Sequence, residues 1–224
     1  MSNIGFRVYT DIKRPSKDII EKFKDIPVAN IADNMGRISC VGTEIKRYSN
    51  VNMLGCAFTV KVAPGDNLMF HKALDMAKPG DVIVVDGEGS SSHSLCGEIM
   101  VQYAIKQGFN GFLINGCIRD SGTISGLNFS IYAIGVQPKG PYKNGPGEIG
   151  IPVCVGGIVI APGDILVGDA DGVVVIKPCD AEDVLRKAIA HNKMEEDTFR
   201  HIAAGTFDRS WVDKTLKEKS CEII

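Results

Sequence analysis

The residues of this chain best suited to chemistry are two carboxylates and a guanidinium at a fixed spacing. Glu98 follows Gly97 at the start of a helix-like run, and Arg119-Asp120 follows the apolar run 111–118, so that twenty residues separate Glu98 from Arg119. Carboxylate oxygens are preferred ligands of Mg²⁺ and Mn²⁺, and a planar guanidinium matches a carboxylate with two hydrogen bonds. This set therefore suits a divalent metal that carries a small oxo-acid.

The elements expected around these residues would bring them to one end of an α/β layer. The runs 81–86 and 112–114 predict buried strands, and 97–106 predicts a helix between them. Ligand sites in open α/β sheets lie at the carboxyl ends of strands, and the first amides of a helix attract anions. We therefore expect the amides of Ile99 and Met100 to face a substrate carboxylate beside Arg119.

Simpler interpretations of these residues stay open on the sequence alone. Arg119-Asp120 also fits a surface ion pair, or an Asp that caps the next helix. Glu98 also fits an ordinary first-turn acid, which the helix dipole favours. The spacing alone does not choose between these interpretations and a ligand site.

Other polar side chains have both a chemical and a structural interpretation. Lys61 fits a Schiff-base amine or an outward-pointing strand lysine, and His93 fits a proton carrier or an exposed loop residue. His71 lies on the apolar face of a predicted helix, which favours a packed residue or one behind the site. His191 and His201 are predicted to face solvent on a late helix, and Glu195-Glu196 fits its solvated face.

The remaining pattern predicts one α/β domain over residues 1–224. Strand-like and helix-like segments alternate along the chain, which favours βαβ units. The strand-like segments are 57–62, 81–86 and 112–114, and the helix-like segments between them are 67–77 and 97–106. A long Gly- and Pro-rich loop is expected at 135–157. Short strands are expected at 153–155, at the end of this segment, and at 158–160, 165–167 and 173–176. We expect N-terminal helices within 15–36, an α/β core over 38–177 and C-terminal helices within 179–220. Residues 79–89 and 162–172 resemble each other, through duplication or as two turns that arose separately.

Composition excludes several classes of partner. The chain has 224 residues and a formal net charge of −2, without a basic stripe for nucleic acid or an apolar run long enough for a membrane span. Seven scattered cysteines include no C-x-x-C pair, and we expect Cys56, Cys117 and Cys154 to be reduced core residues. Without a signal-peptide pattern, a cytoplasmic protein is expected.

Several motifs of the chain resemble those of the RraA-like family. They run from Ile31-Ala32-Asp33 through Pro64-Gly65-Asp66-Asn67, Pro79-Gly80-Asp81-Val82, Gly97-Glu98 and Asn115–Asp120 to Pro162-Gly163-Asp164 and Asp171–Val175. That family includes metal-dependent 4-hydroxy-4-methyl-2-oxoglutarate and 4-carboxy-4-hydroxy-2-oxoadipate aldolases. Its aldolase motif is an Asp, twenty residues and then Arg-Asp; here Glu98 replaces the first Asp and adds one methylene of reach.

The resemblance implies a swivelling-domain-like α/β/β sandwich with βαβ units and a long C-terminal helix. It implies an Mg²⁺ or Mn²⁺ ion held by Asp120, with Glu98 holding a metal-bound water. It also implies substrate binding by Arg119, Gly97 and the amides of Ile99 and Met100. Homotrimers or hexamers are implied, with a glutamate from the late helix of a neighbouring subunit reaching the metal; Glu195, and then Glu196, are the candidates.

The resemblance implies retro-aldol cleavage of 4-hydroxy-2-oxo acids to pyruvate, with decarboxylation of oxaloacetate expected through the same enolate. The main alternative is a non-catalytic regulator that binds a ribonuclease or another protein, as some relatives are described to do. A methyltransferase is disfavoured because the chain has no Gly-rich cofactor loop followed by an acidic strand end. A phosphohistidine carrier fits poorly because His93 does not lie in a Gly/Thr-rich loop.

Overall fold

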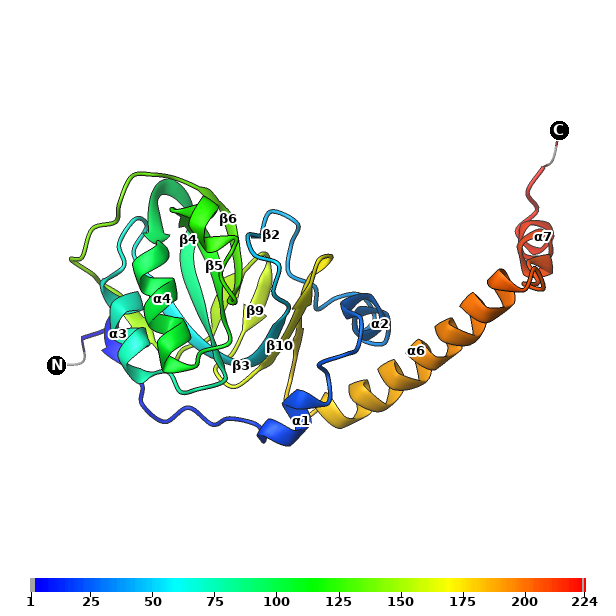
Figure 1. Cartoon of the computed structure of the whole chain (residues 1–224), viewed down its shortest axis with the longest axis horizontal. Helices are drawn as coiled ribbons and strands as arrows, with labels where there is room; N and C mark the ends of the chain where they lie inside the picture. The colour runs from blue at the N-terminus through cyan, green and yellow to red at the C-terminus, as the bar shows by residue number, and fades with distance from the viewer. Residues whose placement is uncertain (1–2, 223) are drawn as a thin grey trace.

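A nine-stranded sheet forms the centre of the computed structural model, which describes residues 3–222 and 224 (Figure 1). Four parallel strands lie side by side, in the order β3 (Met53–Val62), β4 (Asp81–Cys96), β5 (Gly111–Ile118) and β6 (Ser130–Val136). Their continuous apolar runs are typical of strands covered on both faces. The parallel strands therefore put all their carboxyl ends at one edge.

The outer strands extend this sheet on both sides. Both β7 (Gly147–Ile149) and β10 (Ile165–Asp169) pair antiparallel with β3, while β11 (Gly172–Ile176) pairs with β10. The edges are β1 (Phe6–Val8), which is parallel to β7, and β2 (Lys46–Arg47), which is antiparallel to β6. A separate hairpin joins β8 (Val153–Val155) to β9 (Ile158–Ile160).

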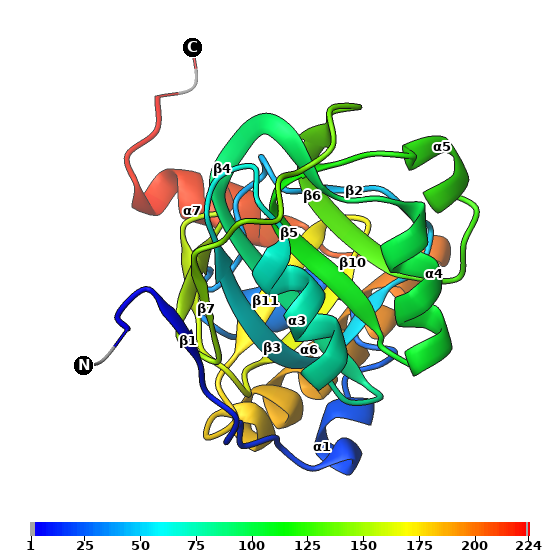
Figure 2. The ribbon, with the colours of Figure 1, turned by 90° about the vertical axis from the view of Figure 1, so that its left-hand side faces the viewer.

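Helices cover one face of the parallel strands. Figure 2 shows α3 (Leu68–Met76) and α4 (Glu98–Gln107) lying across this face, with the single turn α5 (Ser121–Ile124) beyond them. Their core contains Phe70, Phe112 and Phe129, which pack edge to face at centroid distances of 5.0 and 4.8 Å. This packing fixes where the first turn of each helix meets the sheet.

The opposite face of the sheet is covered by strands. Val82, Val84 and Leu113 pack there with Val153 and other residues of the β8–β9 hairpin and of β10 and β11. The order of helices, sheet and further strands is the expected α/β/β sandwich, and this fold class is confirmed. The βαβ units are β3–α3–β4 and β4–α4–β5.

The terminal helices pack together beside β10 and β11. α1 (Lys17–Glu21) and α2 (Val28–Asp33) share an apolar cluster with the first turns of α6 (Ala181–Ala203). Every buried residue of α6 lies in its first half, and α7 (Ser210–Glu218) has none. Beyond those first turns, α6 leaves the body as an arm with α7 at its end (Figure 1).

Three expectations about local structure are corrected. β4 continues through the Gly- and Ser-rich residues 87–94, although His93 was expected in a loop, because register shifts let the strand bend while it pairs with β5. The segment 135–157 is not one loop, since it contains the unpredicted strand β7; the strand expected at 153–155 is confirmed as β8. Cys154 is exposed rather than buried, because alternation in β8 puts its neighbours in the core instead.

The other cysteines follow the expected reduced state. All seven are free thiols, and Cys56 and Cys117 are buried as predicted. Burial raises the pKa of Cys56 to about 12, so this thiol stays protonated and behaves as a small apolar residue. Among the residues that the structure describes, no helix is both long and apolar enough to cross a membrane.

Candidate active site

A small cavity lies at the carboxyl ends of β4 and β5, between the first turns of α3 and α4. Its volume is about 210 Å³. The walls come from four segments that are separated in sequence. They are the start of α3, the junction between β4 and α4, the residues after β5, and a segment near residue 140; the lining residues are Asn67, His71, Leu95, Cys96, Gly97, Ile99, Met100, Arg119, Asp120, Pro141 and Lys143.

Arg119 and Asp120 meet the first turn of α4 at this cavity. Arg119 continues the pairing of β5 with β4, since its amide donates to the Cys96 carbonyl at 2.9 Å. Asp120 then adopts a left-handed backbone conformation, with φ 57° and ψ 30°. Its Oδ2 atom accepts a hydrogen bond from the Glu98 amide at 3.0 Å and lies 3.8 Å from Arg119 Nε. The predicted proximity of the Arg-Asp pair to the start of α4 is therefore observed.

Gly97 permits this close approach. Its backbone is extended, so the requirement for glycine is space rather than an unusual φ angle. A Cβ atom at this position would lie 2.6 Å from Asp120 Oδ2 and 3.0 Å from Arg119 Cγ. Any larger residue would push the Arg-Asp pair away from the helix.

The first turn of α4 provides fewer free amides than expected. The Glu98 amide donates to Asp120, and the Met100 amide donates to the Gly97 carbonyl at 3.1 Å. Within the described residues, the Ile99 amide has no hydrogen-bond partner. Ile99 is therefore the open donor of this turn, and the expectation that the Met100 amide is also unpaired is corrected.

The side chains of Glu98 and Asp120 differ in their relation to the cavity. Asp120 lines it, its side chain is 43% exposed, and in the part of the chain that the structure describes its Oδ1 atom accepts no hydrogen bond. Glu98 approaches Asp120 through its amide, while its carboxylate is not among the lining groups. An exposed carboxylate oxygen is a hard donor that fits Mg²⁺ or Mn²⁺. However, over residues 3–222 and 224 no three His, Cys, Asp or Glu side chains converge as a complete metal site.

The sequence did not single out two residues that line the same cavity, Asn67 and Lys143. Asn67 is buried, and its amide nitrogen donates to the Leu95 carbonyl at 2.9 Å, while Oδ1 has no partner among the described residues. Lys143 is exposed on the rim. The Pro64–Asn67 turn was visible as a motif, but only its packing shows that it faces the cavity.

His71 lies one helical turn after Asn67 and also lines the cavity. The expectation of a packed residue, or of one behind the site, is corrected to a residue of the cavity wall itself. Burial, assisted by the nearby Lys143 charge, lowers the pKa of His71, which favours the neutral imidazole. Cys96 is the buried thiol beside the site, and burial together with the Asp120 charge raises its pKa. Cys96 therefore remains a protonated wall residue rather than a nucleophile.

Lys61 and His93 lie outside the cavity lining. The Lys61 ammonium pairs with Asp86 at 2.9 Å and with Glu88 at 3.1 Å. Burial lowers the pKa of Lys61, but the hydrogen bonds to these two carboxylates outweigh it, so the pKa is raised overall. A lysine so paired is a poor Schiff-base amine, which supports the structural interpretation. His93 is partly exposed and stacks beside Tyr142 at a centroid distance of 5.0 Å.

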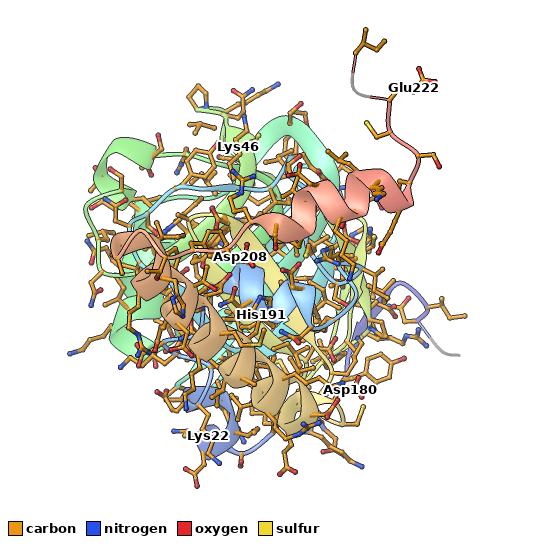
Figure 3. All side chains as sticks on the ribbon, turned by 90° about the vertical axis from the view of Figure 1, so that its right-hand side faces the viewer. Lys22, Lys46, Asp180, His191, Asp208 and Glu222 are labelled. Atoms are coloured by element: carbon orange, nitrogen blue, oxygen red, sulfur yellow. The ribbon has the colours of Figure 1, made fainter. Side chains whose placement is uncertain are left out.

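Glu195 is held on the opposite side of its own chain. The buried Asn30 side chain on α2 donates to Glu195 Oε2 at 2.7 Å, and His191 Nε2 lies 3.8 Å from Glu195 Oε1. His191 also contacts Asn34, so it is part of the α2–α6 contact rather than fully solvent-facing (Figure 3). One chain therefore does not bring Glu195 to Asp120.

The fold and the cavity together define a class: an α/β/β sandwich protein with a small site at the carboxyl ends of its central parallel strands. The model of the RraA-like family, described as Aldolase/RraA, matches residues 28–175. A relative from Halalkalibacterium halodurans is 40% identical over 201 residues, covering 89% of this chain and 96% of the relative. That relative is named "Putative 4-hydroxy-4-methyl-2-oxoglutarate aldolase". The chain belongs to the RraA-like family.

Solved structures of similar proteins agree with this fold. Streptomyces coelicolor RraAS2, described as an unusual member of the RNase ES inhibitor RraA protein family, is 25% identical with a TM-score of 0.76, covering 83% of this chain and 98% of that one. A Geobacillus kaustophilus protein described as an S-adenosylmethionine: 2-dimethylmenaquinone methyltransferase is 33% identical with a TM-score of 0.64. This match covers 67% of this chain and 94% of that chain. An uncharacterized Pseudomonas syringae protein is 24% identical with a TM-score of 0.77, and the match covers 86% of this chain and 96% of that chain.

Proposed function

We propose that this protein is a divalent-metal-dependent lyase that cleaves 4-hydroxy-2-oxo acids to pyruvate by a retro-aldol reaction and also decarboxylates oxaloacetate. The observation that carries the proposal is the meeting of Arg119, Asp120 and the free Ile99 amide at one small cavity. The 40% identity to a relative named as an aldolase supports the same reaction class.

Asp120 is the proposed metal ligand, since Oδ1 is free of hydrogen bonds within the described residues while Oδ2 is held by the Glu98 amide. A bound Mg²⁺ or Mn²⁺ supplies Lewis-acid polarisation of the 2-oxo group. Carboxylate oxygens are the donors that these ions prefer, so the residues fit the ion. The remaining ligands are expected from water and from a neighbouring subunit.

Arg119 is proposed to bind the 2-oxo acid and to balance the negative charge that develops on the 2-oxo oxygen. The Ile99 amide, at the positive end of α4, is proposed to bind the substrate carboxylate. Cleavage of the bond between carbons 3 and 4 requires removal of the 4-hydroxyl proton. Glu98 is proposed to hold a water molecule that accepts this proton.

Loss of carbon dioxide from oxaloacetate leaves the same pyruvate enolate as the retro-aldol cleavage. The groups proposed to stabilise this enolate would serve both reactions, and no 4-hydroxyl proton has to be removed. Oxaloacetate is therefore a simple probe of the Arg119 and Asp120 site, independent of the natural aldol substrate.

The proposed assembly is a homotrimer or hexamer with sites between subunits. Support comes from Glu195, which Asn30 holds on the second half of α6, and from the finding that the described residues of one chain bring no three metal-binding side chains together. In the assembly, Glu195 of one subunit is proposed to approach the metal at Asp120 of another.

The test is pyruvate release from oxaloacetate and from 4-hydroxy-4-methyl-2-oxoglutarate by purified protein. We expect activity with Mg²⁺ or Mn²⁺, its loss with EDTA and its recovery when the metal is restored. Arg119→Ala should lower kcat by about 10²–10³-fold with an unchanged circular dichroism spectrum. Activity that resists EDTA, or pyruvate trapped on Lys61 by borohydride, would contradict the metal-dependent reaction.

A second candidate function is that of a regulator that binds a ribonuclease. The similarity to Streptomyces coelicolor RraAS2 favours it. It predicts inhibition of a ribonuclease by the Arg119→Ala protein as strong as by the wild type, because binding between protein surfaces does not need the Arg-Asp pair. Absence of pyruvate release together with such inhibition would favour the regulator over the lyase.

A further inference from the structure

A groove between α3 and α4 adjoins the candidate active-site cavity. Its volume is about 440 Å³, and it is lined by Leu68, His71, Lys72, Leu74, Asp75, Ile99, Met100 and Tyr103. His71, Ile99 and Met100 line both hollows. The groove is therefore a continuation of the cavity along the helical face of the sandwich.

The inner cavity alone is small for the proposed substrates. Its volume of about 210 Å³ lies below the roughly 300–1,000 Å³ typical of ligand pockets, whereas cavity and groove together lie within that range. Arg119 and the Ile99 amide would occupy the carboxylate end of a 2-oxo acid in the inner part. The other end of a longer substrate must then leave the cavity, and the groove is the adjoining space.

His71 stands at the junction of the two hollows with unused hydrogen-bonding groups. Among the described residues, neither a side chain nor a backbone group bonds to its ring nitrogens. The neutral imidazole presents one donor and one acceptor, which suits a hydroxyl or a carboxylate. Lys143 and Asp75 are the charged groups that influence this ring.

A second polar atom in the same wall also lacks a partner. Asn67 is 2% exposed, and its Oδ1 atom has no hydrogen bond within the described residues. Buried polar groups without partners are rare in folded proteins, and they occur where a ligand or water completes the site. Asn67 and His71 lie one turn apart at the start of α3, so among the described residues this helix end presents one unpartnered amide oxygen and one imidazole without hydrogen bonds at the cavity wall.

We propose that His71 is a specificity-determining residue, which hydrogen-bonds the carboxylate at carbon 5 of a longer 2-oxo acid where that substrate extends from the cavity into the α3–α4 groove. This inference rests on the proposed function. Under this proposal His71 distinguishes substrates by length. Oxaloacetate ends at carbon 4, whereas 4-hydroxy-4-methyl-2-oxoglutarate carries a hydroxyl and a methyl group at carbon 4 and a further carboxylate at carbon 5. Tyr103, which lines only the groove, should contact the longer substrate alone.

The experiment compares kcat/KM for the two substrates in His71→Leu, His71→Asn and wild-type protein. His71→Leu should lower kcat/KM for 4-hydroxy-4-methyl-2-oxoglutarate about tenfold relative to kcat/KM for oxaloacetate. The fall should come mainly from a higher KM for the longer substrate, as expected for one lost hydrogen bond. His71→Asn should recover part of the ratio because it retains donor and acceptor groups. His201→Leu, on the distant arm, is the matched control and should keep the wild-type ratio.

Tyr103→Ala provides an independent test that leaves the inner cavity intact. It should raise KM for the longer substrate more than KM for oxaloacetate. An unchanged ratio in both His71→Leu and Tyr103→Ala, with active wild-type protein, would overturn the inference and leave the proposed function standing. A changed subunit assembly with an unchanged ratio in Tyr103→Ala would instead identify the groove as a subunit contact. Wild-type protein that releases no pyruvate from either substrate would overturn both.

Discussion

Asp120 has an unusual combination of backbone and side-chain constraints. It is one of the few residues other than glycine with a positive φ, and its carboxylate turns back to accept the Glu98 amide. Asp and Asn tolerate the left-handed region better than other residues with a Cβ, for which it costs roughly 1–2 kcal/mol. Position 120 is therefore restricted by conformation as well as by its proposed chemistry, and the two restrictions can be separated by mutation.

Asp120→Asn should abolish metal-dependent pyruvate release while leaving the fold intact. Asn adopts the same backbone conformation and keeps an oxygen for the Glu98 amide, but it removes the negative charge that the metal needs. We expect activity to fall at least about 10²-fold and the free energy of unfolding to change by less than about 0.5 kcal/mol. Denaturant unfolding and Mn²⁺ binding measured by calorimetry check this; retained Mn²⁺ affinity would contradict the role of Asp120.

Gly140→Ala should displace Arg119 without unfolding the protein. A Cβ atom at Gly140 would lie 2.9 Å from Arg119 Nη1, the flexible end of a half-exposed side chain. We expect a fall in kcat/KM of about 10- to 100-fold, because small displacements of a positioning group are costly to catalysis. Gly126→Ala, whose added Cβ meets its nearest neighbour at an ordinary 3.6 Å, is the control. Equal activity in both variants would show that Arg119 does not need its observed position.

At the scale of elements, the segment that carries Pro141 and Lys143 is fixed to the turn before α3. The Tyr142 amide donates to the Gly65 carbonyl, and the Asn67 amide donates to the Tyr142 carbonyl. Asp66 is buried and accepts hydrogen bonds from the amides of Leu68 and Asn144. The Gly- and Pro-rich sequence is thus held as a wall of the cavity by backbone contacts to a Pro-Gly-Asp turn.

Asp66→Ala should loosen this wall. Two hydrogen bonds to a buried carboxylate are lost, which we expect to reduce the free energy of unfolding by about 1–3 kcal/mol and to raise KM for 2-oxo acids. Asp197→Ala is the control, since Asp197 forms an exposed ion pair with Arg200 on the distant arm and its loss should change the stability by less than about 1 kcal/mol. Urea unfolding and steady-state kinetics provide both readouts. An unchanged KM in a destabilised Asp66→Ala protein would show that the segment does not shape the site.

Local patterns predicted most of these elements. The β-branched and apolar runs gave the buried strands, and the 3.6-residue period gave α3, α4 and α6. The extension of β4 through residues 87–94 was not predicted, because Gly and Ser have low strand propensity and only pairing with β5 keeps this segment extended. In the same way, Cys154 resembled a core residue until the partner strand of β8 fixed which side faces out.

At the scale of the whole molecule, the arm is the part that its own chain leaves unpacked. Phe199 is 65% exposed and Trp211 is 60% exposed, on helices that extend away from the body (Figure 1). Large exposed aromatic side chains are typical of protein interfaces. This exposure is in accord with the proposed assembly, in which a late-helix glutamate serves a neighbouring site.

Subunit mixing tests whether Glu195 acts in another subunit. Asp120→Asn and Glu195→Gln proteins should each be inactive, whereas co-expressed mixtures should recover activity at about one quarter of the sites, as random assembly of a closed ring predicts. Glu196→Gln is the control and should stay active, because only Glu195 is fixed by Asn30. A mixture as inactive as its components, or a fully active monomer in sedimentation, would rule out the shared site.

The sequence by itself determined the family, the alternation of strands and helices, and the pairing of an Arg-Asp dipeptide with a helix start twenty residues earlier. These features depend on local periodicity and short spacing, which the chain carries without knowledge of its long-range contacts. Tertiary structure alone decided that Asn67, His71 and Lys143 line the same cavity, that the Met100 amide is occupied, and that Glu195 faces away from Asp120 of its own chain. The physical reason is that a cavity wall is built from segments distant in sequence, and their packing against the sheet fixes which side chains meet.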